Sequence, residues 1–116
     1  MKKNKISKNW LNKQRRDIYV RKSKLEGYRS RAIYKLKEID DKFKIIRNGI
    51  KVVDLGSAPG SWSQYLSEKS KNSKILSIDL KNIEKIHHVT HLIGDFLDEK
   101  NQTIISNFFG NKLDLI

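Results

Sequence analysis

Apolar positions along this chain follow two patterns, short continuous runs and a spacing of three to four residues, and these patterns predict alternating strands and helices. Residues 50–55 and 74–80 are short runs of mostly apolar residues, as found in strands that are buried on both faces of a parallel sheet. Between them, apolar side chains recur three and four residues apart over residues 60–70, which is the period of a helix. This order of elements predicts an α/β fold with a parallel sheet.

The same patterns extend toward both ends of the chain. Further strands are expected at residues 90–96 and from residue 112 onward, and further helices at residues 11–20, 30–43 and 97–109. Ser30 is the expected N-cap of the second helix. The apolar stripe of that helix would consist of Ala32, Leu36, Ile39 and Phe43.

Three remaining segments contain weaker signals. Residues 1–9 are rich in Asn and Lys and are expected to be disordered. Residues 82–88 are expected to form a short helix or a loop. Residues 112–116 begin an apolar strand at which the sequence stops, so the chain is expected to be the N-terminal half of a larger domain.

The loop after the first strand carries the strongest functional signal. Gly56 and Gly60 enclose a proline, and they allow the backbone to approach a ligand closely. The spacing G-x-x-x-G matches neither the dinucleotide fingerprint nor the phosphate-binding P-loop. Asp54, at the end of the strand, favours a ligand with cationic and hydroxyl-rich parts. S-adenosylmethionine fits, since it has an amino group, a sulfonium and ribose hydroxyls but no phosphate.

Two later acids also follow predicted strands. Asp79 comes 25 residues after Asp54, which is a typical interval for a strand, a helix and a second strand. An acid at that place can accept hydrogen bonds from ribose hydroxyls, although it could also be an ordinary turn or cap residue. Asp95 lies at the end of the third predicted strand and could cap the helix that follows.

Two segments carry a resemblance to a known family. Residues 54–64, DLGSAPGSWSQ, resemble motif I of the FtsJ/RrmJ family of RNA ribose 2'-O-methyltransferases, with Ser61 where that family more often has Gly. Residues 30–39, SRAIYKLKEI, resemble the family's S-R-A-x-[FY]-K-L-x-E-I helix. The best fit is the bacterial branch that methylates a uridine ribose in 23S rRNA of the large ribosomal subunit.

The resemblance implies a fold, a cofactor and a set of site residues. The fold would be a Rossmann-like S-adenosylmethionine-dependent methyltransferase, incomplete, with strands 1–3 and the start of strand 4 in the order 3-2-1-4. Asp95 would accept a hydrogen bond from the adenine amino group, and the backbone near Phe96 would frame the ring. The residues expected to bind S-adenosylmethionine are Asp54, Gly56, Gly60, Trp62, Asp79, Asp95 and Phe96.

The resemblance also implies one catalytic residue, Lys35. It matches the first member of the family's Lys-Asp-Lys-Glu set and would orient the ribose hydroxyl or stabilise negative charge on its oxygen. By pattern alone, Lys35 lies at the edge of the predicted apolar stripe and is not distinguished from its neighbours. The other three members of the set would lie beyond Ile116.

Charge divides the chain into two parts. Residues 1–51 contain 18 Lys and Arg against 5 Asp and Glu, whereas residues 52–116 contain 7 against 8. A one-sided basic block of this kind usually binds a polyanion, and RNA is favoured because the acceptor 2'-OH does not exist in DNA. We therefore expect an RNA-binding extension at residues 1–29 and a methyltransferase half-domain at residues 30–116. A basic tail without a defined partner is the alternative.

Composition limits the other possibilities. The chain has no cysteine, so neither disulfides nor thiolate chemistry is expected. No run is apolar and long enough to span a membrane, and a cytoplasmic protein is expected, monomeric when complete. His87, His88 and His91 have metal-like spacings without a carboxylate pattern, so no metal site is expected. The partner would be rRNA or the large ribosomal subunit. A tRNA ribose methyltransferase and a catalytically incomplete RNA- or cofactor-binding fragment remain alternatives.

Overall fold

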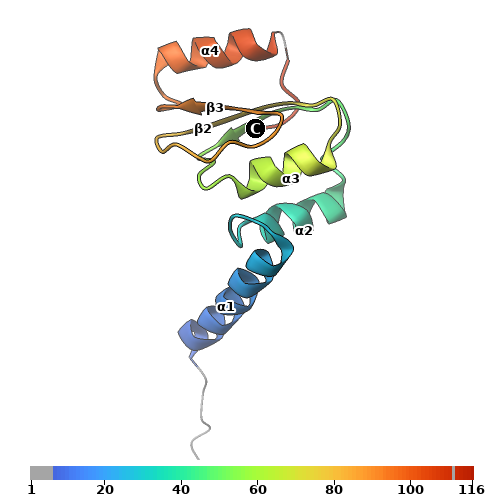
Figure 1. The fold of residues 1–116 in the computed structure, drawn as a ribbon, viewed down its shortest axis with the longest axis vertical. Coiled ribbons are helices and arrows are strands. Elements are labelled where there is room, and N and C mark those ends of the chain that lie inside the picture. Colours follow the sequence, from blue (N-terminus) through green and yellow to red (C-terminus); the bar gives the residue numbers. More distant parts are fainter. Residues whose placement is uncertain (1–6, 111) are drawn as a thin grey trace, which may run out of the picture.

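Helices and strands alternate through most of the chain in the computed structural model, which describes residues 7–110 and 112–116. Figure 1 shows the arrangement of these elements. In chain order they are α1 (Lys8–Glu26), α2 (Ile33–Phe43), β1 (Lys51–Leu55), α3 (Ser61–Lys69), β2 (Lys74–Asp79), β3 (Val89–Ile93) and α4 (Glu99–Phe109). The predicted strand, helix and strand around the glycine loop are confirmed.

The sheet has three parallel strands in the order β1-β2-β3. Val52 lies opposite Ile75, and Leu76 lies opposite Thr90. Leu115 forms a single parallel bridge with Val52 at the free edge of β1. The predicted order 3-2-1-4 is therefore followed, but within the described residues the fourth strand consists of this bridge alone.

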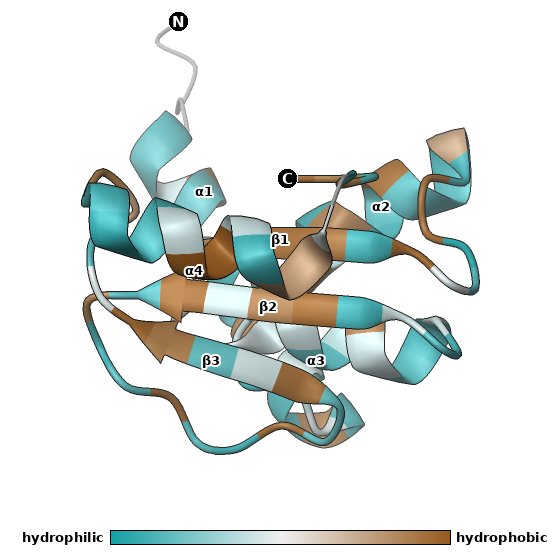
Figure 2. Ribbon diagram, turned by 90° about the horizontal axis from the view of Figure 1, so that it is seen from above, coloured by the Kyte–Doolittle hydropathy of each residue, from teal (hydrophilic) through white to brown (hydrophobic). Residues whose placement is uncertain are grey.

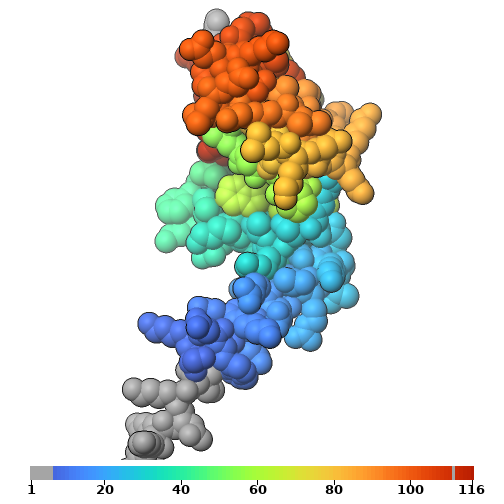
Figure 3. Space-filling view, turned by 90° about the vertical axis from the view of Figure 1, so that its left-hand side faces the viewer, coloured from blue at the N-terminus to red at the C-terminus, as the bar shows by residue number. Residues whose placement is uncertain are grey.

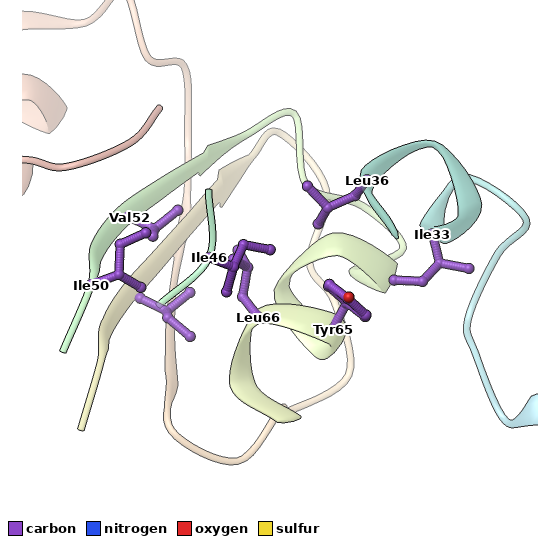
Figure 4. Packing of buried hydrophobic residues seen from close by; sticks show 8 residues of the cluster. Ile33, Leu36, Ile46, Ile50, Val52, Tyr65 and Leu66 are labelled. Atoms are coloured by element: carbon purple, nitrogen blue, oxygen red, sulfur yellow. The ribbon is translucent and has the colours of Figure 1, made fainter. Parts of the chain in front are cut away.

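Helices cover both faces of the sheet (Figure 2). Because side chains alternate along a strand, Val52 and Ile75 face α2 and α3, whereas Val53 and Leu76 face α4. Figure 4 shows the first of these two cores, in which residues of α2, α3 and β1 interdigitate. Its buried members are Ile33, Leu36, Ile46, Ile50, Val52, Tyr65, Leu66 and Ile75. This packing fixes the glycine loop between β1 and α3.

The buried face of α2 differs from the predicted stripe. Ile33 and Leu36 are buried as hydrophobic anchors, but Phe43 is 64% exposed and Ala32 is also exposed. Asp40 is buried instead, because its carboxylate accepts hydrogen bonds from the Ile46 amide (2.9 Å) and the Tyr65 hydroxyl (3.2 Å). The stripe prediction was confirmed for Leu36, which is buried, and for Ile39, which is half-buried, but it was wrong for Ala32 and Phe43. It left out Asp40 because it assumed that only apolar side chains would face the core.

Three predicted helix starts also need correction. Ser30 does not cap α2, which begins after Ala32, because the Ser30 hydroxyl is hydrogen-bonded to Ser61 Oγ at 2.8 Å. Asp98, rather than Asp95, caps α4 and accepts from the Lys100 amide at 3.0 Å. Helix α1 starts at residue 8 with Ser7 as its N-cap, so it is longer than predicted.

The loops and ends of the chain refine other expectations. Disorder was wrongly predicted for residues 7–9, while residues 1–6 lie outside the described part of the chain. Residues 82–88 form a loop, and β3 ends at residue 93 rather than 96. Figures 1 and 3 show α1 projecting away from the body of the molecule. None of the helices in the described ranges is long and apolar enough to cross a bilayer.

Candidate functional site

The glycine loop is held against the carboxyl end of β2. The amides of Gly56 and Ser57 donate to the Ile78 carbonyl at 2.9 and 3.2 Å. The Ala58 amide donates to Asp79 Oδ2 at 3.0 Å. The loop is therefore positioned by the neighbouring strand as well as by its own chain.

A cavity of about 260 Å³ lies beside this loop, and we call it the loop cavity. Its lining includes Ser30, Ala32, Asp54, Gly56, Ser57 and Trp62. Three of the seven predicted cofactor-binding residues are in that set. The indole of Trp62 is positioned by a 2.7 Å hydrogen bond from Nε1 to the Ala32 carbonyl, so its N–H is already used within the protein.

Two carboxylates at adjacent strand ends have pKa values that are shifted in opposite directions. Asp54 is 8% exposed, and burial raises its pKa even though its Oδ2 accepts a hydrogen bond from Ser63 Oγ at 2.7 Å. Backbone hydrogen bonds from Lys81 and Ala58 lower the pKa of Asp79. A cationic ligand group would therefore stabilise the ionised form of Asp54, whereas the backbone already stabilises the ionised form of Asp79.

The loop cavity also contains a polar atom without a partner. Ser57 Oγ is buried and makes no hydrogen bond within the described residues. Gly56 has a φ of +66°, and a Cβ built on it would meet no atom within 4 Å. An unsatisfied hydroxyl beside open backbone fits a bound polar molecule, because a buried hydroxyl without a partner is unfavourable. The lining is thus compatible with the amino, sulfonium and hydroxyl groups of S-adenosylmethionine.

Gly60 has a different role from Gly56. Its φ of +109° is rarely adopted by residues with a side chain, and a Cβ would lie 3.0 Å from Ile86 Cδ1 and 3.2 Å from Arg29 Nη1. The close approach at Gly60 is therefore to protein side chains of the segment before α2 and the loop before β3. Gly60 does not line the loop cavity in this structure.

Arg29 is a residue that the sequence reasoning missed. Its guanidinium donates to the carbonyls of Pro59 (3.1 Å), Glu84 (2.7 Å) and Lys85 (3.1 Å), and so joins two loops that are far apart in sequence. Its own amide donates to Gln64 Oε1 at 3.1 Å. Only its position next to the S-R-A segment could have drawn attention to it, since a single arginine in a basic region has no distinctive spacing.

The remaining predicted site residues lie outside the loop cavity. Asp95 is exposed after β3 and accepts a hydrogen bond from the Leu97 amide at 2.9 Å. Phe96 lines a separate hollow between β1 and α4. Lys35 lines a groove between α1 and α2. That groove and the loop cavity share one lining residue, Ala32, and so they adjoin each other.

His91 is engaged by the protein itself. Its Nε2 lies 3.0 Å from the Lys81 carbonyl and its Nδ1 lies 2.7 Å from Ser77 Oγ. In the neutral imidazole, Nε2 carries the hydrogen because a carbonyl only accepts, and Nδ1 accepts from the Ser77 hydroxyl. The imidazole therefore joins β2, β3 and the loop between them.

Comparisons of this chain with family models and with known proteins identify the same family. The model of the FtsJ-like methyltransferase family matches residues 28–116. The chain is 56% identical over 116 residues to ribosomal RNA large subunit methyltransferase E of Pelagibacter ubique, covering 100% of this chain and 57% of that protein. It is 46% identical over 118 residues to the protein of the same name from Legionella pneumophila strain Corby, with coverages of 100% and 57%.

A solved structure supports the same relationship. It is a ribosomal RNA methyltransferase from Plasmodium falciparum, 36% identical, with a TM-score of 0.58. The match covers 66% of this chain and 49% of that one. The chain therefore spans about half the length of the relatives that it matches.

Proposed function

The chain belongs to the FtsJ-like methyltransferase family, and from this we propose that its residues bind S-adenosylmethionine for methylation of a ribose 2'-OH. The proposed acceptor is a uridine in 23S rRNA of the large ribosomal subunit. The observation that carries the proposal is the loop cavity, in which a buried carboxylate with a raised pKa lies near an unpaired hydroxyl. Both groups gain from a ligand that is cationic and rich in hydrogen-bonding groups.

The lining residues suggest how the cofactor would be held. Asp54 would accept from the cationic part, and Ser57 Oγ would gain its missing hydrogen bond. Each carboxylate oxygen of Asp79 accepts one backbone amide and keeps a further lone pair, which leaves it able to accept from ribose hydroxyls. We also propose that the backbone of Gly56 contacts the cofactor, because no protein atom covers it on the side where a Cβ would lie. Trp62 would contribute the face of its indole.

Asp95 and Phe96 are assigned to the adenine, and this part of the proposal rests on the family resemblance alone. Gly60 is proposed to act through packing that shapes the loop. The bound cofactor would supply a methyl group that its sulfonium has already activated. The protein must therefore align the acceptor oxygen and assist the loss of its proton.

Lys35 is proposed to act on the acceptor side. It lines the groove that adjoins the loop cavity at Ala32, rather than the cavity itself. An exposed ammonium at that place can orient a ribose hydroxyl or stabilise negative charge developing on its oxygen. This arrangement supports binding of the cofactor in the loop cavity and of the RNA in the neighbouring groove.

Charge and the names of the relatives support rRNA as the substrate. The first 51 residues contain 18 Lys and Arg against 5 Asp and Glu, as expected for a surface that contacts phosphates. The relatives are named as ribosomal RNA methyltransferases, which favours rRNA over tRNA. A cytoplasmic monomer acting on rRNA is the accompanying proposal.

Calorimetric titration of the 116-residue chain with S-adenosylmethionine and, separately, with NAD tests the cofactor assignment. Saturable S-adenosylmethionine binding that weakens about 10- to 100-fold in Asp54→Asn is expected, with no binding of NAD. NAD binding without S-adenosylmethionine binding would contradict the proposal. Transfer of tritiated methyl groups to 23S rRNA, large subunits and tRNA then tests the substrate. Cofactor binding without transfer would favour a cofactor-binding fragment.

A further inference from the structure

A groove with a pronounced basic lining lies between α1 and α2. We call it the elbow groove; its volume is about 740 Å³. Two acidic residues, Glu38 and Asp41, also line it. The cations that line it are Lys22, Arg31, Lys35, Lys37 and Lys42. Cations therefore outnumber acids, which makes the groove complementary to a polyanion.

Two tyrosines form an aromatic wall of the elbow groove. Tyr19 is 44% exposed, and its ring centroid lies 5.4 Å from that of Tyr34 at an interplanar angle of 35°. Tyr34 is fixed by a 3.0 Å hydrogen bond to Glu26, by the edge of Tyr28 at 6.3 Å and by Lys22 Nζ at 4.9 Å from its ring centroid. Tyr34 thus supports Tyr19, which keeps much of its surface open to solvent.

The elbow groove and the loop cavity lie on the same residue, Ala32. The segment before α2 is joined to α3 by the Trp62 and Gln64 side chains. Figure 3 shows α1 projecting from the body of the molecule. A strand bound in the groove would therefore lie next to the proposed cofactor site.

We propose that the elbow groove binds single-stranded RNA, with an unpaired base stacked on Tyr19 and phosphates contacting Lys22, Arg31 and Lys42. Stacking needs an open base face, which a paired duplex does not offer at its grooves. Charge alone would attract a duplex or an anionic membrane equally well, so the exposed aromatic ring is what favours a single strand. The inference rests on the proposed function and specifies where and in what form the RNA is bound.

The test uses the full 116-residue chain and fluorescence anisotropy. One probe is a fluorescein-labelled ten-nucleotide RNA without self-complementarity, and the other is the same strand in a blunt duplex. Tyr19→Ala is compared with Tyr19→Phe, which keeps the ring, and with Ile18→Ala, an exposed neighbour outside the groove. Circular dichroism checks that helix content is retained, and Tyr19→Leu keeps apolar bulk without the ring.

Tyr19→Ala and Tyr19→Leu are expected to weaken single-strand binding roughly 5- to 150-fold, with duplex binding unchanged. Tyr19→Phe and Ile18→Ala should remain within about twofold of the wild type. Equal losses for strand and duplex, or tighter binding to phosphatidylserine vesicles than to RNA, would overturn the inference. S-adenosylmethionine binding is titrated for every variant. If the wild-type chain binds S-adenosylmethionine but shows no preference for the single strand over the duplex, the groove proposal alone is contradicted. If it prefers the single strand but does not bind S-adenosylmethionine, the proposed function alone is contradicted.

Discussion

The loop cavity and the elbow groove adjoin each other, but they are built in different ways. In the loop cavity, the polar atoms of Asp54 and Ser57 are buried and their surroundings are fixed by hydrogen bonds to the backbone and to Ser63. In the elbow groove, four of the five lining cations are exposed and Lys37 is half-buried. Among these cations, Lys22 is the one that forms an ion pair within the described residues, at 3.9 Å from Glu26.

This difference predicts different sensitivities to substitution. A buried polar group has few alternatives, so removing or straining it changes the free energy by kilocalories per mole. An exposed cation is screened by water and salt, and each contributes little by itself. The loop cavity should therefore respond strongly to single changes, whereas the elbow groove should respond gradually to the number of charges. Four experiments test this contrast.

The largest effect is expected for Gly60→Ala in the loop. The added Cβ would combine a backbone φ of +109° with a 3.0 Å approach to Ile86, so the free energy of unfolding should fall by about 2–4 kcal/mol. Urea denaturation measures the change. Gly49→Ala is the matched control, since it has a φ of +76° but open space around the new Cβ, and it should lose only about 1 kcal/mol. Equal losses would show that packing around Gly60 is unimportant.

Asp54→Asn should separate binding from stability. Asparagine can still accept the Ser63 hydrogen bond but has no charge, so affinity for S-adenosylmethionine should fall about 10- to 100-fold. Burial raises the pKa of Asp54, so its ionisation opposes folding increasingly as pH rises through the folded-state value. The variant should therefore unfold at the same or a higher urea concentration at pH 7.

The control for this variant is Glu68→Gln, an exposed change on α3. It should alter neither the affinity for S-adenosylmethionine nor the stability in urea. A substantial loss of stability in Asp54→Asn would show that the negative charge supports the fold, contrary to the proposed role. Unchanged cofactor affinity would remove Asp54 from the binding site.

Asp79→Asn should have a moderate effect with the opposite pH dependence. Backbone amides lower the pKa of Asp79, so its carboxylate stabilises the fold above the unfolded-state pKa of 3.8, and this stabilisation is lost as pH falls through the folded value. The variant should lose about 1–2 kcal/mol at pH 7, with the difference from wild type shrinking below pH 4. Urea titrations from pH 2.5 to 7 measure it, and a constant difference would contradict the assignment.

The smallest effect is expected in the elbow groove. Lys42→Gln should weaken binding of single-stranded RNA about twofold at 0.15 M salt, with the log–log salt slope reduced by about 0.7. Lys100→Gln on α4 is the control, since it removes the same charge far from the groove in sequence and should change binding less. A tenfold loss for Lys42→Gln would mean that the groove holds a buried ion pair with the RNA, which would remove the contrast between the two sites.

Much of the fold could be predicted from local patterns. The strands followed from short apolar runs, and the helix after the glycine loop followed from a spacing of three to four residues, which places side chains on one face. The strand order followed from the family resemblance. The Rossmann-like methyltransferase fold and the family were predicted from the glycine loop and the S-R-A segment. The family match and the solved structure confirm both. Helix starts were less accurate, since Ser30 and Asp95 form alternative hydrogen bonds that local sequence does not reveal.

By itself, the sequence determined the alternation of strands and helices, the glycine loop and the one-sided charge, because each is a property of neighbouring residues. Only the tertiary structure decided that Asp40 is buried, that Arg29 joins two loops and that the two hollows meet at Ala32. Each of these depends on atoms that are distant in sequence, and hydrogen bonds and close packing form only when the folded chain brings those atoms within a few ångströms.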